Sequence, residues 1–344
     1  MSRNLLSLSL TATLLGGAAF AEVPNVATDI APVHSLVARV MEGVGTPDLI
    51  IQSGASPHEY SLRPSEASSL QNADIVFWIG EDLTPWLEDT IETLAPNANA
   101  VSLLDAEDTI QLEFRENAVF EAHDHADEEG HDDHDDHDDH DGHSDHDDHS
   151  DHDDHSDHDD HDDHDDHAGH DHGEHDPHAW LSPRNAATWM NVIAAQLSAA
   201  DPDNAGTYFA NAAAGRAEID DLIVQVNTTL DPVRGRAFVV FHDAYQYFET
   251  DFGFPASGAI SLSDASDPSP ARIAEIQERV AAQSIACVLA EPQFNLGLVN
   301  TVLDGSGAST GVMDPLGSSF DLGPNLYPQM IADMASVLAE CLAP

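Results

Sequence analysis

The sequence predicts an α/β protein of two lobes, each with a roughly four-stranded parallel sheet flanked by helices, joined by one long helix. Three observations indicate this fold. Short β-rich runs alternate with helical patterns, the runs fall into an early and a late group of four, and a long helix-compatible stretch lies between the groups. Strands that alternate with helices are typical of βα units, whose strands pair in parallel.

The eight expected strands are short runs rich in β-branched, aromatic and aliphatic residues. They are Asn25–Thr28, Asp48–Gln52, Asp74–Ile79, Ala100–Leu103, Ala237–Phe241, Gly258–Leu262, Ile285–Ala290 and Gly311–Met313. The first four precede a strongly acidic segment and the last four lie toward the C-terminal end. Each group is therefore expected to form the sheet of one lobe.

Helix starts are marked by capping residues followed by proline. Thr84-Pro85, Ser182-Pro183 and Ser269-Pro270 each place an N-cap residue before a Pro at the first helical position. The stretch Pro202–Leu230 is compatible with one long helix of about 44 Å, at 1.5 Å per residue. Such a helix is long enough to connect two small lobes.

These signals divide the chain into six segments. They are a signal peptide (1–21), an N-terminal lobe (22–120), a His/Asp-rich insert (121–176), the rest of the N-terminal lobe (177–201), a connecting helix (202–231) and a C-terminal lobe (232–344). The first segment has a positive residue, Arg3, an apolar core, and an A-x-A cleavage signal ending at Ala21. We therefore expect an exported protein of the bacterial periplasm, cleaved after Ala21, with no segment inserted in the membrane.

The charge of the chain restricts its partners. It carries 64 acidic and 10 basic residues, a formal net charge of −54, and every basic residue is Arg. Phosphate backbones and anionic lipid surfaces repel such a chain, so nucleic acid and membrane surfaces are excluded as partners. Cations are the partners it should attract.

The His/Asp-rich insert holds much of that charge. Residues 121–176 contain 28 acids and 18 histidines and no basic residue. With few apolar side chains to bury, the insert is expected to be disordered in the absence of a ligand. Its imidazoles and carboxylates are all potential metal ligands without a fixed geometry, so it is expected to bind additional Zn²⁺ weakly at several places.

Four histidines lie outside the insert: His34, His58, His178 and His242. The last three fall on loops at the ends of expected elements, where α/β proteins place ligand sites. Three neutral imidazoles form a suitable donor set for zinc. Their spacing alone does not distinguish metal ligands from structural histidines.

Two cysteines, Cys287 and Cys341, are the only ones in the chain. In an exported protein they are expected to form a disulfide that ties the last helix to a strand. Two buried free thiols are the alternative.

Several motifs resemble those of the zinc-specific periplasmic binding proteins of ABC uptake systems, the ZnuA type within the metal-binding cluster of solute-binding proteins. The resemblance rests on GASPHEYSLRP (54–64), QNADIVFW (71–78), HAWLSP (178–183), VFHDAYQYFE (240–249), AEPQF (290–294) and MDPLG (313–317). It implies two α/β lobes joined by a long helix, with Zn²⁺ bound in the cleft between them. It also implies delivery of the ion to an ABC permease subunit served by a cytoplasmic ATPase.

The resemblance places the metal ligands at His58, His178 and His242, with Asp314 in the position of an acidic fourth ligand. Glu59 or water are the alternatives for that fourth position. His34 matches no ligand motif and is expected to be structural. Manganese and iron relatives tend to carry a carboxylate where His242 stands, and three imidazoles favour zinc over those harder ions.

Other functions remain open on the residues alone. A zinc hydrolase also uses three protein ligands and an open position, and Glu291 or Asp243 could act as a general base. The chain lacks H-E-x-x-H and nucleophile motifs, so we expect no enzyme activity. A manganese or iron receptor and a periplasmic zinc buffer without a transporter are the further alternatives. We expect the protein to be a monomer.

Overall fold

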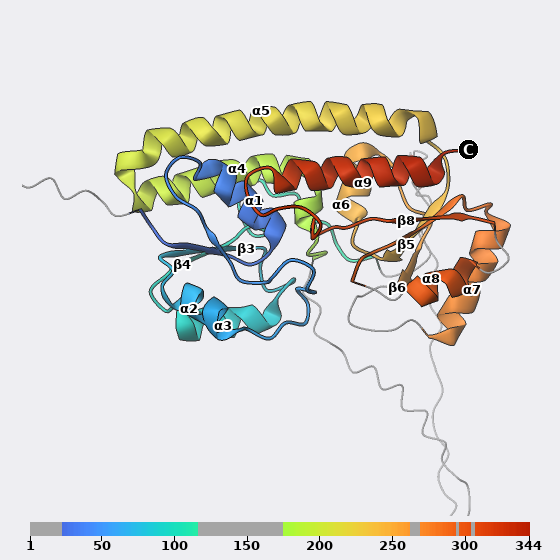
Figure 1. Cartoon of the computed structure of the whole chain (residues 1–344), viewed down its shortest axis with the longest axis horizontal. Coiled ribbons are helices and arrows are strands. Elements are labelled where there is room, and N and C mark those ends of the chain that lie inside the picture. The colour runs from blue at the N-terminus through green and yellow to red at the C-terminus, as the bar shows by residue number, and fades with distance from the viewer. Residues whose placement is uncertain (1–22, 116–174, 262–268, 294–295, 304–306) are drawn as a thin grey trace, which may run out of the picture. The chain divides into compact units, whose positions relative to one another are not determined.

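The computed structural model describes residues 23–115, 175–261, 269–293, 296–303 and 307–344. Within these residues the chain forms two four-stranded parallel sheets flanked by helices, and the predicted fold class is confirmed (Figure 1). The expected signal peptide and nearly all of the His/Asp-rich insert lie outside the described residues. No helix in the described ranges is both long and apolar enough to cross a membrane.

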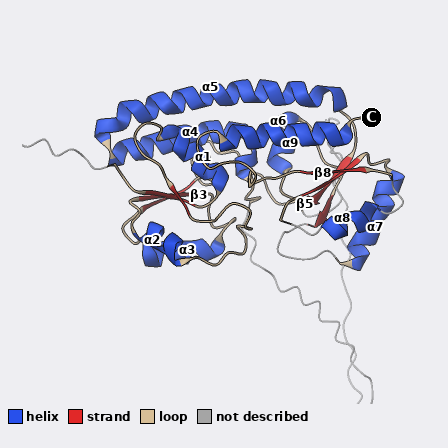
Figure 2. Cartoon of the chain, viewed as in Figure 1, coloured by secondary structure: helices blue, strands red, loops and turns tan. Residues whose placement is uncertain are grey.

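The first sheet has the strand order β2-β1-β3-β4. Its strands are β1 (Val26–Thr28), β2 (Asp48–Leu49), β3 (Ile75–Trp78) and β4 (Asn99–Ser102), and its helices are α1 (Ala31–Val40), α2 (Pro64–Gln71) and α3 (Pro85–Leu94). β1 and β3 are buried along their whole length. Strands covered on both faces are typical of parallel sheets, and Figure 2 shows helices above and below this one.

The second sheet repeats this topology with the order β6-β5-β7-β8. Its strands are β5 (Phe238–His242), β6 (Ala259–Ser261), β7 (Cys287–Ala290) and β8 (Ser309–Val312), and its helices are α6 (Gln246–Phe252), α7 (Pro270–Ala282) and α8 (Leu296–Leu303). All eight predicted strands are therefore present. Boundaries differ by a few residues, and His242, expected just after its strand, is the last residue of β5.

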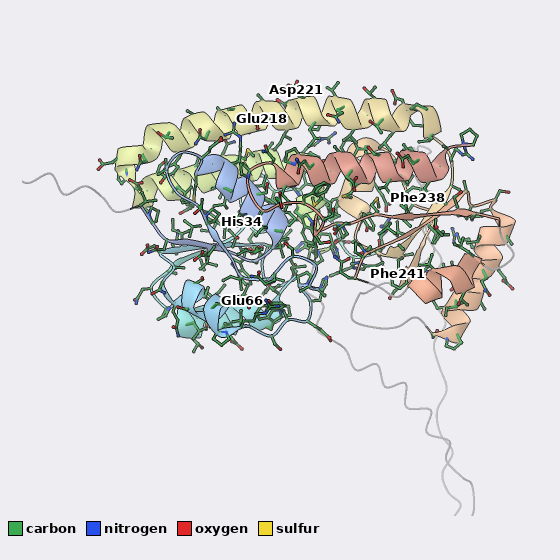
Figure 3. The ribbon with its side chains drawn as sticks, in the orientation of Figure 1. His34, Glu66, Glu218, Asp221, Phe238 and Phe241 are labelled. Carbon is green, nitrogen blue, oxygen red and sulfur yellow. A yellow bond between two sulfur atoms is a disulfide. The ribbon has the colours of Figure 1, made fainter. Side chains whose placement is uncertain are left out.

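Alternating residues of β5 face two different cores. Phe238 and Val240 belong to the large core shared with the first lobe, whereas Val239 and Phe241 belong to a smaller core near α7 (Figure 3). This follows from the two-residue repeat of a strand, whose successive side chains point to opposite faces. The large core is continuous from the first sheet to the second, so the lobes are packed together rather than linked by a bare hinge.

Two of the three expected capping signals make the expected bond. The Ser182 and Ser269 hydroxyls accept hydrogen bonds from the backbone amides of Asn185 and Arg272, at the starts of α4 (Pro183–Ala200) and α7. Thr84 precedes α3 but makes no side-chain cap, and its hydroxyl instead donates to Gly80 O at 3.4 Å. The proline at the first helical position therefore marks the start in all three cases, with or without the cap.

The long connecting helix is α5, Ala205–Leu230, preceded by a 3₁₀ turn at Pro202–Asn204 and followed by another at Asp231–Val233. It runs over both lobes in Figure 1 and packs on α4 and on the last helix, α9 (Leu326–Leu342). Gly215 allows the close approach to α4: a Cβ there would lie 2.5 Å from Met190 Sδ, so a larger residue would require the Met190 side chain to move.

A second helix also connects the lobes. The N-terminal end of α9 meets the first lobe, where the Tyr327 amide donates to Ser35 Oγ at 2.9 Å. Its C-terminal end meets the second sheet, where Cys341 is bonded to Cys287 of β7. The expected disulfide is thus present, and it holds the end of a helix that crosses both lobes. Sequence reasoning assigned this crossing role to α5 alone.

His34 is buried on α1 beside the first sheet (Figure 3). Its Nε2–H donates to Pro47 O at 3.1 Å, and within the described residues its Nδ1 has no hydrogen-bond partner. Burial lowers the pKa of this imidazole, and the Pro47 carbonyl and Asp48 only partly offset that effect. The fold therefore favours the neutral ring.

We expect His34 to make the fold less stable in acid. Because its folded-state pKa is lowered, its stabilisation is present above the unfolded value of about 6.5 and is lost as the pH falls below it. Urea unfolding at pH 7.5 and 5.5 measures this: His34→Gln should lose less unfolding free energy between the two pH values than the parent. Equal losses would show that His34 does not contribute to acid sensitivity.

Candidate metal centre

Three of the four isolated histidines meet in one cluster. His58 lies on the loop between β2 and α2, His178 precedes the 3₁₀ turn Ala179–Leu181, and His242 ends β5. Each offers one ring nitrogen, and these three atoms all lie within 4.8 Å of one another. The ring centroids are 4.9 to 6.1 Å apart. Three imidazoles from three separate segments are thus arranged around one point.

The three rings differ in how firmly they are held. His178 and His242 are 4% exposed, whereas His58 is only partly buried. The His58 backbone amide donates to Ser56 Oγ at 3.3 Å within its own loop. Two imidazoles are therefore set in the protein interior, and the third comes from a loop nearer to the surface.

Local structure fixes the position of His178. Asp176 Oδ1 accepts hydrogen bonds from the His178 backbone amide at 3.0 Å and from its ring Nδ1 at 2.7 Å. The chain then turns through Trp180, whose indole donates to Pro315 O at 2.8 Å, and enters α4 at the Ser182 cap. The bond from Trp180 joins this segment to the loop that follows β8, so both lobes contribute to the site.

His242 lies at the point where the second sheet reverses its strand order. In the order β6-β5-β7-β8, ligands of open α/β sheets bind beyond the carboxyl ends of the two central strands, here β5 and β7. His242 ends β5, and Glu291 directly follows β7, with its Oε1 3.4 Å from His242 Nδ1. A carboxylate thus lies beside the Nδ1 of two of the three imidazoles.

In the first sheet, Asp29 occupies the equivalent point, beyond the carboxyl ends of the central strands β1 and β3. This carboxylate follows β1 and accepts hydrogen bonds from the backbone amides of Ile30 and Ile79, each at 2.7 Å. Burial raises its pKa to about 7 although both bonds favour the anion. Asp29 therefore joins the ends of β1 and β3, whereas the second sheet presents His242 and Glu291 at the same place.

The cluster borders a small pocket. It is lined by Ser56, Pro57, His58, His178, Trp180, His242, Glu291, Gln293, Pro315 and Leu316. The space open to the centre of a water-sized sphere is about 20 Å³, and about 10–15 Å³ is enough for one water. The pocket therefore has room for a single ion or a water.

Buried charge surrounds the pocket. Asp243 follows His242 and is paired with Arg115, which also binds Glu249 at 2.8 Å. Burial raises the pKa values of Asp243 and Glu249, and Arg115 opposes this rise. Burial likewise raises the pKa of Asp176 to about 7. This concentration of carboxylates around one guanidinium favours a bound cation.

Asp314 is placed differently from the three histidines. It is buried in the loop after β8, where its Oδ1 accepts from the Leu316 amide at 3.0 Å. Its Oδ2 accepts from the Ser318 amide and hydroxyl, each at 2.6 Å. Pro315 and Leu316 of this loop line the pocket, and the Asp314 carboxylate shapes the loop that carries them.

We expect Asp314→Asn to weaken zinc binding by about tenfold or less, equivalent to about 1.4 kcal/mol. Water can fill a fourth coordination position, and asparagine can still accept the bond from the Leu316 amide. Calorimetric zinc titration of Asp314→Asn and of His58→Ala compares the two losses of affinity. A loss as large as that of His58→Ala would assign Asp314 a role equal to an imidazole.

Glu59 and His34 are separate from the cluster. Glu59 is exposed, and His34 is bonded to Pro47 O and is not one of the three grouped histidines. The pocket also contains a group that sequence reasoning missed. Both amide atoms of Gln293 are buried and lack a hydrogen-bond partner among the described residues.

Asp176 was missed as a contact of His178 for a different reason. It ends a segment with a very high density of Asp and His, so nothing distinguished it from its neighbours. The signal that could have found it is its place two residues before an isolated histidine, in Asp176-Pro177-His178. An Asp at that spacing can bond back to the chain two residues on.

Comparisons with known proteins identify a family for the chain. The family model described as zinc-uptake complex component A, periplasmic (ZnuA), matches residues 26–341. A High-affinity zinc uptake system protein ZnuA from Brucella suis biovar 1 (strain 1330) is 45% identical over 345 residues, which cover 99% of each chain. Its namesake from Paracoccus denitrificans (strain Pd 1222) is 46% identical over 335 residues, 96% of each chain.

Solved structures support the fold. A crystal structure of ZnuA matches with a TM-score of 0.68 at 20% identity, covering 94% of this chain and 100% of that one. A ZnuA deletion mutant lacking 138–173 with zinc bound matches with a TM-score of 0.67, also at 20% identity, covering 94% of this chain and 99% of that one.

Proposed function

Because the chain belongs to the ZnuA family of periplasmic components of zinc uptake, we propose that it captures one Zn²⁺ at the three-histidine cluster and delivers it to an ABC permease. His58, His178 and His242 are the proposed ligands. The permease subunit and its cytoplasmic ATPase supply the passage and the energy for import. The chain is a solute-binding component, and we propose that it catalyses no reaction itself.

The observation that carries this proposal is the donor set. Three ring nitrogens within 4.8 Å of one another fit a zinc ion, whose bonds to histidine nitrogen are about 2.0–2.1 Å long. Manganese and magnesium prefer carboxylate and carbonyl oxygens, so an all-imidazole set favours zinc. A fourth position is left for water, or for Asp314 if it gives up its bonds to Ser318.

The site also suits capture and release. His242 comes from the second sheet, His58 from a loop of the first, and His178 from the segment joined to both. Zinc bound to all three would draw together loops of both lobes, so the loaded and empty proteins would present different surfaces. We propose that the permease recognises this difference.

Export through a signal peptide cleaved after Ala21 is part of the proposal, since the ion must be captured outside the inner membrane. The family of the chain, a component of zinc uptake, argues against the hydrolase alternative. Glu291 lies beside His242, and we assign it the role of supporting that ring rather than that of a general base.

We further propose that the His/Asp-rich insert binds several Zn²⁺ weakly and raises the local supply of the ion. Its ligands are many and lack a fixed arrangement, so ordering them around zinc has an entropic cost that the folded cluster avoids. Tethering beside the cluster would increase the effective concentration of zinc.

Calorimetric zinc titration of the intact chain and of a variant lacking residues 116–174 tests both roles. The deletion is expected to leave one tight site with nearly unchanged affinity and to remove the weak binding. Competition with Mn²⁺ on the same variant should leave zinc bound. Loss of the tight site on deletion would show that the insert holds the primary metal, as a buffer would, and preference for Mn²⁺ would indicate a manganese receptor.

A further inference from the structure

Asp176 contacts one imidazole of the three-histidine cluster closely. It is 2% exposed, and its Oδ1 lies 2.7 Å from His178 Nδ1 and 3.0 Å from the His178 backbone amide. The corresponding distance from Glu291 to His242 Nδ1 is 3.4 Å. The Asp176–His178 contact is therefore the shorter of these two.

This contact determines which ring nitrogen can bind a metal. An ionised carboxylate only accepts hydrogen bonds, so Nδ1 of His178 must carry the proton and Nε2 must carry the lone pair. Carboxylates bonded in this way orient metal-binding histidines and make them stronger bases. Asp176 thus prepares Nε2 of His178 as the metal-binding atom.

Asp176, the last residue of the His/Asp-rich insert, is itself held by the segment that precedes the insert and by α6. Its backbone amide donates to Leu112 O at 2.8 Å, and its backbone carbonyl accepts from the Tyr247 hydroxyl at 2.9 Å. The same hydroxyl accepts from the Leu112 amide at 2.9 Å. Glu113 and His175 form an antiparallel bridge beside them. The chain therefore leaves for the insert and returns from it at one fixed point.

Helix α6 completes this arrangement. With its amide oriented to satisfy both neighbours, Gln246 donates to Asp176 Oδ2 at 3.0 Å and to Glu113 O at 3.2 Å. Arg115, the last described residue before the insert, binds Asp243 and Glu249. Both ends of the insert are thus attached to residues that adjoin His178 or His242.

We propose that Asp176 is a positioning residue for zinc binding, acting through His178, and that it makes the base of the His/Asp-rich insert a structural part of the zinc pocket. The inference rests on the proposed role of His178 as a ligand. The base of the insert is defined here as Leu112–Arg115 with His175 and Asp176. The ends of the insert are then bonded to residues next to the metal ligands and do not belong to a loop far from the pocket.

The test replaces Asp176 and a matched buried carboxylate in the full-length protein at pH 8. Asp201, at the C-terminal end of α4, is the control: it is fully buried and its Oδ2 accepts from the Tyr208 hydroxyl at 2.9 Å, whereas His178 precedes the other end of that helix. Zinc affinity is measured by competition with a chromophoric chelator. The fluorescence of Trp180, whose ring lies 5.3 Å from His178, reports the pocket separately from the insert.

Asp176→Ala is expected to weaken zinc binding about 10- to 100-fold, the usual effect of losing such a partner. Asp201→Ala should change it less than about threefold. Asp176→Asn keeps an acceptor for Nδ1–H but loses the charge, so it should weaken binding by an intermediate amount. If circular dichroism shows that the alanine variant does not fold, the zinc affinity of the asparagine variant tests the proposal.

A double-mutant cycle separates positioning from a general structural role. In a His178→Ala background, the Asp176 substitution should have almost no further effect on zinc affinity, because its only route to the metal has been removed. The inference is overturned if the folded Asp176 variants bind zinc within about threefold of the parent, or if the losses from Asp176 and His178 add. If His178→Ala alone leaves affinity unchanged, the ligand assignment fails instead.

Discussion

Replacing any one of His58, His178 or His242 by alanine is expected to lower the affinity for zinc about 100-fold or more, which corresponds to about 2.7 kcal/mol. Each substitution removes one of three ring nitrogens that lie within 4.8 Å of one another. Water then takes the vacant coordination position. A water oxygen is a weaker donor for zinc than an imidazole nitrogen oriented by the fold.

The three losses should not be equal. His178 and His242 are almost fully buried and each has a carboxylate near its Nδ1, so both are arranged before the ion arrives. His58 is half-buried on a loop nearer to the surface. We therefore expect His58→Ala to have the smallest effect of the three, although still a large one.

Competition with a zinc chelator on the variant lacking residues 116–174 measures these affinities without the weak sites. His34→Gln provides the control, because His34 is a buried histidine bonded to Pro47 O and outside the cluster. It should leave zinc affinity unchanged. Any of the three histidines whose loss changes the affinity by less than about threefold is not a ligand.

Removing the disulfide should have the largest effect on stability. Cys287 and Cys341 are separated by 54 positions, and closing a loop of that length restricts the unfolded chain by about 4 kcal/mol in the chain-entropy model. The bridge also holds the end of α9, whose other end is bonded to Ser35 of the first lobe. We expect the Cys287→Ala, Cys341→Ala double variant to lose about 2–5 kcal/mol of unfolding free energy.

Guanidinium unfolding followed by circular dichroism tests this expectation, and reduction of the parent protein before unfolding provides an independent comparison. The folded double variant should still bind zinc with near-parent affinity, since Cys287 begins β7 and the pocket lies beyond the other end of that strand. A loss below about 1 kcal/mol would show that packing of α9, not the bridge, holds the two lobes together.

Much of the fold could be predicted from local signals. Each strand is a short apolar run between turn residues, and each of three helices begins at a Pro preceded by Ser or Thr. Such signals depend on a few neighbouring residues, so they can be recognised without knowing how the rest of the chain folds. The parallel pairing follows from the alternation of strands and helices, and the two sheets confirm it.

The crossing of α9 between the lobes could not be predicted in this way. Its residues indicate a helix, but the contact of Tyr327 with Ser35 joins positions that are 292 residues apart. Apolar periodicity shows that a helix has a buried face and does not show which lobe covers it. The long α5, recognised by its length, was therefore the only connection expected.

The sequence alone determined which histidines to consider, because the composition outside residues 121–176 leaves four, and three of them follow elements at loop positions typical of ligand sites. Only the tertiary structure decided that these three meet, that Asp176 and Glu291 lie beside His178 and His242, and that the Asp314 carboxylate is occupied by its own loop. The physical reason is the distance along the chain over which each interaction acts. Strand and helix preferences depend on neighbouring residues, whereas the pairing of an imidazole with a carboxylate depends on how distant loops pack at the ends of two sheets.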